Sequence, residues 1–151
     1  MKITFWGAAR QVTGSKFLLE LEDGYKILID CGTDLSRDRQ EGDAYFPFEP
    51  SDINLVLLTH AHIDHSGAIP LLYQYGYSGQ VLCTTPTYAL TELLLRDAAG
   101  INSQRIQKKW NPKKKKLKEF IPDDVYLDSQ VDFATRRFVN IAFNEKFAVK
   151  P

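Results

Sequence analysis

The sequence predicts an α/β fold in which helices flank a mixed sheet. Residues 53–59 form a short, almost continuously apolar run, which is typical of a buried strand, and a helix start follows this run. Upstream, Glu22-Asp23-Gly24 separates two strand-like runs, and Asp-Gly between such runs is a strong hairpin signal because the turn needs positive φ. With 151 residues, 44% of them hydrophobic, the chain has the size and apolar content of one domain with one core.

Further strands are expected wherever a short apolar run lies between breaks. The runs cover residues 2–6, 16–21, 25–29, 80–83, 139–143 and 146–149. The polar segment 33–51 contains Tyr45, Phe46 and Phe48. These aromatic rings are expected to fold the segment back onto the core, although they could also rim a substrate groove.

Three helices are expected. The first begins near Asp64 or Ser66, either of which could cap it, and the second begins with Thr85 as N-cap and Pro86 in its first turn. The second is expected to run past residue 100 toward Trp110, with an apolar side formed by Tyr88, Leu90, Leu93, Leu94 and Ala98. A third, short helix would be capped by Asp128 or Ser129. Its side chains expected to point into the core are Val131, Phe133, Ala134 and Phe138.

The composition narrows the class of protein. Lysine plus arginine equal aspartate plus glutamate at 19 each, so net charge gives no general attraction to nucleic acid. Two cysteines, Cys31 and Cys83, are too few for a disulfide framework and are expected as buried free thiols. Because no apolar stretch approaches membrane-spanning length and the start does not resemble a signal peptide, we expect a cytoplasmic protein without a membrane partner.

The hexapeptide from His60 to His65 carries the chemistry. Imidazole and carboxylate are ligands for zinc and similar ions. His60 and His62 would project to the same side of an extended backbone, whereas Asp64 and His65 would lie toward a second position. These side chains could instead only cap a helix, but all three histidines of the chain fall in this hexapeptide, which favours a metal site.

The hexapeptide resembles the H-x-H-x-D-H motif of the metallo-β-lactamase superfamily. Residues 7–15 and 27–32 resemble the first two signatures of its β-CASP branch of RNA-processing nucleases, and residues 85–87 and 94–99 also resemble that branch. The family fold is an αββα sandwich. The resemblance therefore implies that residues 1–151 form an incomplete, N-terminal portion of such a domain.

The resemblance also implies roles for individual residues. His60 and His62 would hold one zinc ion and Asp64 and His65 a second, with Asp64 also orienting the attacking water as the catalytic residue. Asp30 would support the site through a histidine N–H, and the alternative is a loop cap at Gly32 and Thr33. Two further hydroxyls, those of Thr13 and Ser15, could contact a substrate phosphate, or their loop could be only a turn.

Several parts of the resembled site cannot be assigned. A third histidine for the first metal, a later aspartate that bridges both metals and the β-CASP cap domain have no counterpart here. We therefore expect an N-terminal fragment of a zinc-dependent RNA phosphodiesterase, inactive alone, with weak or no zinc binding and a tendency to self-associate. The alternatives are another hydrolase of this fold, acting on thioesters, lactones or lactams, and a non-catalytic binding or scaffold module.

The lysine-rich stretch 108–118, with Trp110 in it, allows two interpretations. It could contact RNA phosphates while the indole stacks on a base. It could equally be a solvated connection between two helices, since like charges at this density resist packing.

Overall fold

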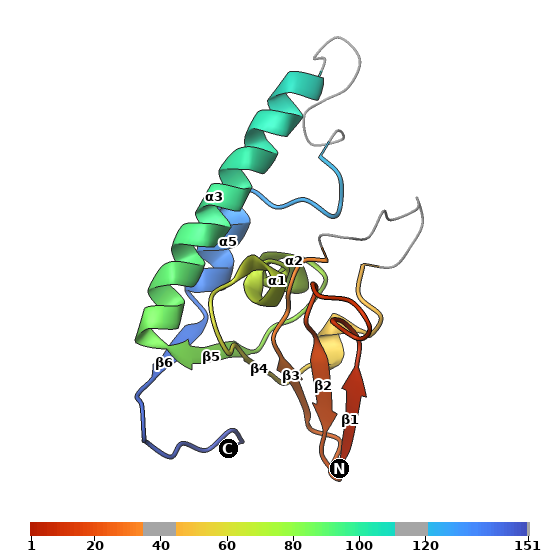
Figure 1. Cartoon of the computed structure of the whole chain (residues 1–151), viewed down its shortest axis with the longest axis vertical. Coiled ribbons are helices and arrows are strands. Elements are labelled where there is room, and N and C mark those ends of the chain that lie inside the picture. The colour runs from red at the N-terminus through yellow and green to blue at the C-terminus, as the bar shows by residue number, and fades with distance from the viewer. Residues whose placement is uncertain (35–44, 111–120, 151) are drawn as a thin grey trace.

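The computed structural model describes residues 1–34, 45–110 and 121–150. Its centre is one six-stranded sheet with the strands in sequence order (Figure 1). The strands are β1 (Lys2–Phe5), β2 (Phe17–Glu20), β3 (Lys26–Ile29), β4 (Leu55–Leu57), β5 (Gln80–Thr84) and β6 (Phe138–Ile141).

The sheet is mixed, as the sequence predicted. Strands β1, β2 and β3 are antiparallel, and the β2–β3 turn uses Gly24 at φ 82°, the left-handed conformation that glycine adopts without cost. Strands β3 to β6 are parallel. The carboxyl ends of β3 and β4 therefore meet at one edge of the sheet, where ligand sites of open α/β sheets usually lie.

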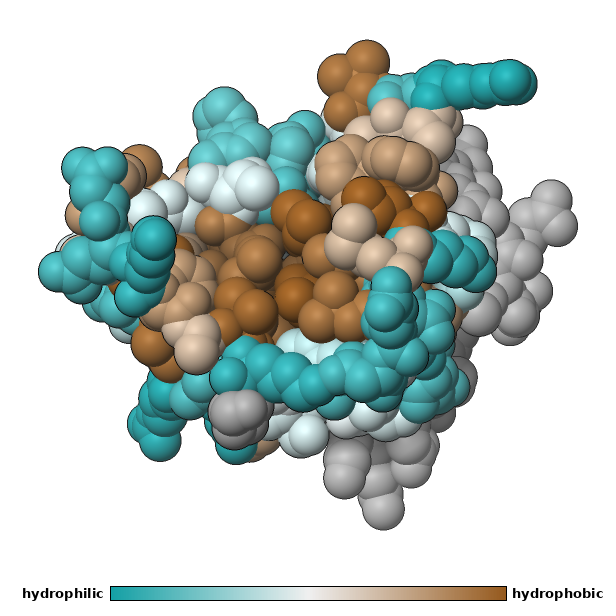
Figure 2. Space-filling model, turned by 90° about the horizontal axis from the view of Figure 1, so that it is seen from below, coloured by the Kyte–Doolittle hydropathy of each residue, from teal (hydrophilic) through white to brown (hydrophobic). Residues whose placement is uncertain are grey.

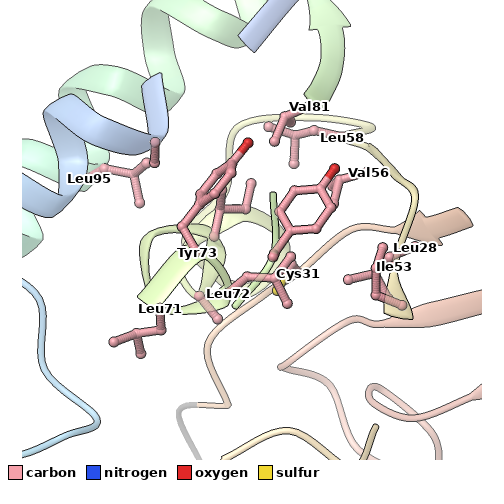
Figure 3. Close-up of a cluster of buried hydrophobic side chains, with 14 of the residues drawn as sticks. Leu28, Cys31, Ile53, Val56, Leu58, Leu71, Leu72, Tyr73, Val81 and Leu95 are labelled. Atoms are coloured by element: carbon pink, nitrogen blue, oxygen red, sulfur yellow. The ribbon is translucent and has the colours of Figure 1, made fainter. Parts of the chain in front are cut away.

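The helices cover one face of this sheet (Figure 1). They are α1 (Ile63–Ser66), α2 (Ile69–Gln74), α3 (Thr85–Lys109) and α5 (Asp128–Thr135), and a short 3-10 helix, η1 (Pro50–Asp52), precedes β4. Between helices and sheet lies a core that includes Leu28, Val56, Leu72, Val81 and Leu95, each fully buried (Figure 3). The packing fixes the helices over the sheet and so fixes the loops at its edge.

The predicted caps were wrong at all three helix starts. The N-cap residues are His62 for α1, Thr84 for α3 and Leu127 for α5. Neither α1 nor α3 has a side chain that caps its first turn. In α1, the Ser66 hydroxyl instead donates to the carbonyl oxygens of Ala61 and His62, at 2.9 and 3.0 Å.

The predicted apolar side of α3 was only partly right, since Tyr88 and Ala98 pack against the core but Leu90 and Leu93 do not. The helix does run to Lys109, as predicted. Leu90 and Leu93 are 55% and 65% exposed, and Tyr88, Leu94 and Ala98 are only partly buried. The buried side is formed by Thr87, Thr91, Leu95, Ala99 and Ile106. Because apolar residues occur on both sides of α3 and the buried side contains two threonines, hydropathy did not identify the face that packs.

Two expectations near the C-terminal end also fail. Phe133 is 49% exposed, whereas its neighbours Val131 and Ala134 are fully buried and Phe138 is partly buried in β6. Residues 146–149 form no strand, because this segment crosses the sheet face opposite the helices instead of pairing with an edge. It is held there in part by the Tyr25 hydroxyl, which donates to the Val149 carbonyl oxygen at 2.9 Å.

Other expectations agree with the structure. Phe46 is buried and Tyr45 and Phe48 pack against the core, while both cysteines are free and buried. Among the described residues, no helix is both long enough and apolar enough to cross a membrane. The cytoplasmic location stays a prediction. Most of the lysine-rich stretch, from residue 111 on, lies outside the described residues.

Candidate metal centre

The predicted ligands lie at the carboxyl ends of β3 and β4. Asp30 directly follows β3, and the hexapeptide leads from β4 into α1. The two segments are joined through main-chain hydrogen bonds, in which Cys31 N–H donates to the His65 carbonyl oxygen at 2.7 Å and Ser15 N–H to that of Asp64 at 2.9 Å. The hexapeptide is thereby held from two sides by loops distant in sequence.

Asp30 is the buried acid of the site. Only 2% exposed, it has a φ of 62°, a left-handed conformation that is unusual for any residue except glycine. Its carboxylate accepts the Thr59 main-chain N–H at 2.8 Å and faces Nδ1 of His65 at 2.8 Å. The expected histidine partner of Asp30 is therefore present, and the alternative loop cap is not what engages this carboxylate.

The three histidines form one cluster. The ring centroid of His60 lies 4.0 Å from that of His65 and 4.8 Å from that of His62. His62 is exposed, and the Asp64 carboxylate lies 3.5 Å from Nε2 of His65. The structure thus brings together all four predicted ligands.

The donor set fits part of a metal centre. Nδ1 of His60 contacts the Thr59 hydroxyl at 3.0 Å and Nδ1 of His65 contacts Asp30, so Nε2 of each ring is the nitrogen left to bind an ion. Across residues 1–34, 45–110 and 121–150, however, no three His, Cys, Asp and Glu side chains form a group that could hold one ion. The chain presents oriented ligands but no complete ligand set.

Cys31 directly follows Asp30 and is fully buried. Burial raises the pKa of its thiol to about 12, and burial likewise raises the pKa of Cys83 to about 11. Both thiols are therefore protonated at neutral pH in the metal-free chain.

The two predicted phosphate contacts lie differently. Ser15 is 2% exposed, whereas Thr13 is partly exposed and its hydroxyl donates to Asp34 at 3.4 Å. Between them and the sheet lies Lys16, which the sequence analysis did not single out. Its ammonium is buried and donates to the carbonyl oxygens of Gly14 and Gly32, at 3.3 and 2.5 Å. A lysine in an alternating strand pattern carries no sequence signal for this role.

The model of the metallo-beta-lactamase superfamily matches residues 11–139. This match covers most of the chain, and the mixed sheet with histidines at its carboxyl edge agrees with it. The chain belongs to the metallo-beta-lactamase superfamily and contains part of that fold.

Two curated proteins are similar in sequence to most of this chain. The chain is 46% identical over 101 residues to "Ribonuclease TTHA0252" of Thermus thermophilus, covering 67% of this chain and 23% of the relative. It is 38% identical over 130 residues to "Transcription termination factor FttA" of Methanosarcina mazei, covering 82% of this chain and 20% of the relative. A solved metallo-beta-lactamase from Cronobacter sakazakii aligns with a TM-score of 0.45 at 23% identity, over 64% of this chain and 36% of that one. The chain thus spans about a fifth of the length of the curated relatives it matches.

Proposed function

We propose that this chain supplies half of the active site of a zinc-dependent phosphodiesterase that cleaves RNA, of the β-CASP branch. The observation that supports it best is the group of four ligand side chains at the sheet edge, two of them with Nδ1 already engaged. Relatives that are named a ribonuclease and a transcription termination factor support RNA as the substrate.

His60 and His62 would hold one zinc ion, and Asp64 and His65 a second. Two such ions, when bound, activate a water and stabilise the attacking and leaving oxygens at phosphorus. Asp30 would orient His65, and Asp64 would also orient the attacking water.

We further propose that the remaining ligands and the cap domain belong to a longer polypeptide of which this chain is the N-terminal part. The small share of the relatives that the chain covers supports this. Two protein ligands per ion, against three or four in ordinary zinc sites, make zinc binding by this chain weak and leave the chain inactive alone.

The test compares this chain with a longer polypeptide that contains it, by metal analysis and by cleavage of a labelled RNA oligonucleotide with added zinc. We expect substoichiometric zinc and no cleavage for the chain alone, and cleavage by the longer polypeptide. There, Asp64→Asn should lower the rate by about 10²-fold or more. Asp124→Asn, at an exposed carboxylate in the segment before α5, is the matched control and should leave the rate unchanged.

Other outcomes would overturn the proposal. Tight, stoichiometric zinc with RNA cleavage by the chain alone would contradict the half-site. Hydrolysis of a thioester or lactone without RNA cleavage by the longer polypeptide would favour another hydrolase of this fold.

A further inference from the structure

A threonine hydroxyl lies between the buried carboxylate and one histidine of the centre. Thr59 follows β4 and precedes His60, and its Oγ1 lies 3.0 and 2.9 Å from the two carboxylate oxygens of Asp30. The same oxygen lies 3.0 Å from Nδ1 of His60. The main-chain N–H of Thr59 also donates to Asp30, which fixes the threonine from two sides.

If Asp30 is ionised and His60 is neutral, these contacts allow one arrangement of protons. An ionised carboxylate only accepts hydrogen bonds, so the single hydroxyl proton of Thr59 is donated to Asp30. Toward His60 the Thr59 oxygen can then only accept, which places a proton on Nδ1 of that ring. Nε2 of His60 is left with its lone pair, the form in which an imidazole binds a metal ion.

His65 reaches the same form by a shorter route. Its Nδ1 lies 2.8 Å from Oδ2 of Asp30 with no group between, so the proton is again on Nδ1. One carboxylate therefore sets both rings. It acts directly on His65 and through a hydroxyl on His60.

We propose that Thr59 is a positioning residue for His60. Its hydroxyl links the Asp30 carboxylate to Nδ1 of His60 and so holds that imidazole in the Nδ1–H tautomer. Ligating histidines usually donate their second ring N–H to a carboxylate, a carbonyl or a water, and loss of such a partner typically weakens metal binding by about 10- to 100-fold. The metal-binding part of this inference rests on the proposed function. The tautomer part does not, because it concerns the metal-free chain.

The first test reads the tautomers from imidazole ¹⁵N chemical shifts in the metal-free chain, at a pH where the shifts show all three rings neutral. We expect Nδ1–H at His60 and His65 in the unchanged chain. Thr59→Val keeps the shape and removes the hydroxyl, so His60 should move toward the tautomer mixture of an unrestrained imidazole while His65 is unchanged. Thr59→Ser keeps the hydroxyl and should restore His60.

Asp30→Asn provides the complementary variant, because it should disturb both rings. A His60 that stays Nδ1–H in Thr59→Val, or that is Nε2–H in the unchanged chain, would overturn the relay. Since Thr59 is exposed, the valine variant is expected to fold, and circular dichroism checks this.

The second test measures Co²⁺ binding from its visible absorption. Relative to the unchanged chain, Thr59→Val should weaken binding by about 10-fold or more, and Thr59→Ser by about 2-fold or less. Equal affinity of the valine variant and the unchanged chain would overturn the positioning role. If no form of the chain, the longer polypeptide included, binds Co²⁺, the proposed function fails, whereas the tautomer result stands or falls by the first test alone.

Discussion

At the scale of single residues, the centre depends on a position where no side chain fits. Gly32 passes so close to the hexapeptide that an added Cβ would lie 1.6 Å from the carbonyl oxygen of Asp64 and 2.1 Å from its carbonyl carbon. Both are main-chain atoms, so no rotation of a side chain could relieve the clash. The close approach also lets Gly32 N–H donate to the Ser15 carbonyl oxygen at 3.0 Å.

Gly32→Ala should therefore destabilise the fold by about 1–3 kcal/mol, the usual cost of overpacking, because the loop that holds Asp64 must move. Urea unfolding measures this. Gly100→Ala is the matched control, since it lies inside α3 with no atom within 4 Å of an added Cβ. It should stabilise the chain by about 0.5–1 kcal/mol. Equal effects of the two substitutions would contradict the close packing at Gly32.

The residue types of the site could be predicted from the sequence, but not all of its partners. Clustered histidines beside an aspartate point to a metal because few other arrangements need them together. Thr59 and Lys16 gave no such signal. Their contacts join segments that lie far apart in the chain, and those contacts exist only once β3 and β4 pair and the loops meet.

At the scale of elements, α3 has apolar residues on two sides, of which one side is buried and the other is exposed. Leu95 is fully buried against the core, whereas Leu93 is 65% exposed. Leu95→Ala should lower the free energy of unfolding by about 2–5 kcal/mol, because it removes buried methyl groups and leaves a cavity. Leu93→Ala, the same substitution two residues away, should change it by about 0.5 kcal/mol or less. A larger loss at Leu93 in urea unfolding would show that the predicted side of α3 packs after all.

The existence of α3 was predictable and its orientation was not. Proline in the first turn and a long run of helix-forming residues mark the helix. Its orientation depends on which side chains fill the space over β5 and α5, and threonines at 87 and 91 fill part of it. A threonine has about the volume of a valine and can fill such a contact, although the Thr91 hydroxyl is buried without a hydrogen-bond partner in the described part of the chain. Hydropathy alone therefore places these threonines on the wrong side of the helix.

At the scale of the whole molecule, the two faces of the sheet differ. The helices cover the face that carries Leu18, Leu28, Val56, Val81 and Cys83. The strand registers place on the other face Ile3, Phe5, Phe17, Leu19, Ile27, Ile29, Leu55, Leu57, Leu82, Val139 and Ile141. Figure 2 shows an apolar area on the side of the molecule turned away from the helices, with polar residues around it. Within the described residues, the segment that contains Val149 packs over part of this face.

The part of this face that stays exposed, which includes Ile3, Phe5 and Val139, should cause the chain to self-associate, since exposed apolar patches favour burial against another surface. Light scattering coupled to size-exclusion chromatography should show a mass that rises above 17.2 kDa with concentration. Phe5→Lys places a charge on this face, where Phe5 is 61% exposed, and should lower the association.

Leu90→Lys is the matched control for this prediction. It adds the same charge at a leucine that is 55% exposed on α3, on the helix side of the sheet, and should leave the association as it is. If Leu90→Lys dissociates the chain and Phe5→Lys does not, the outer side of α3 is the interface. If the unchanged chain stays monomeric at high concentration, the sheet face is adequately covered by the residues already present.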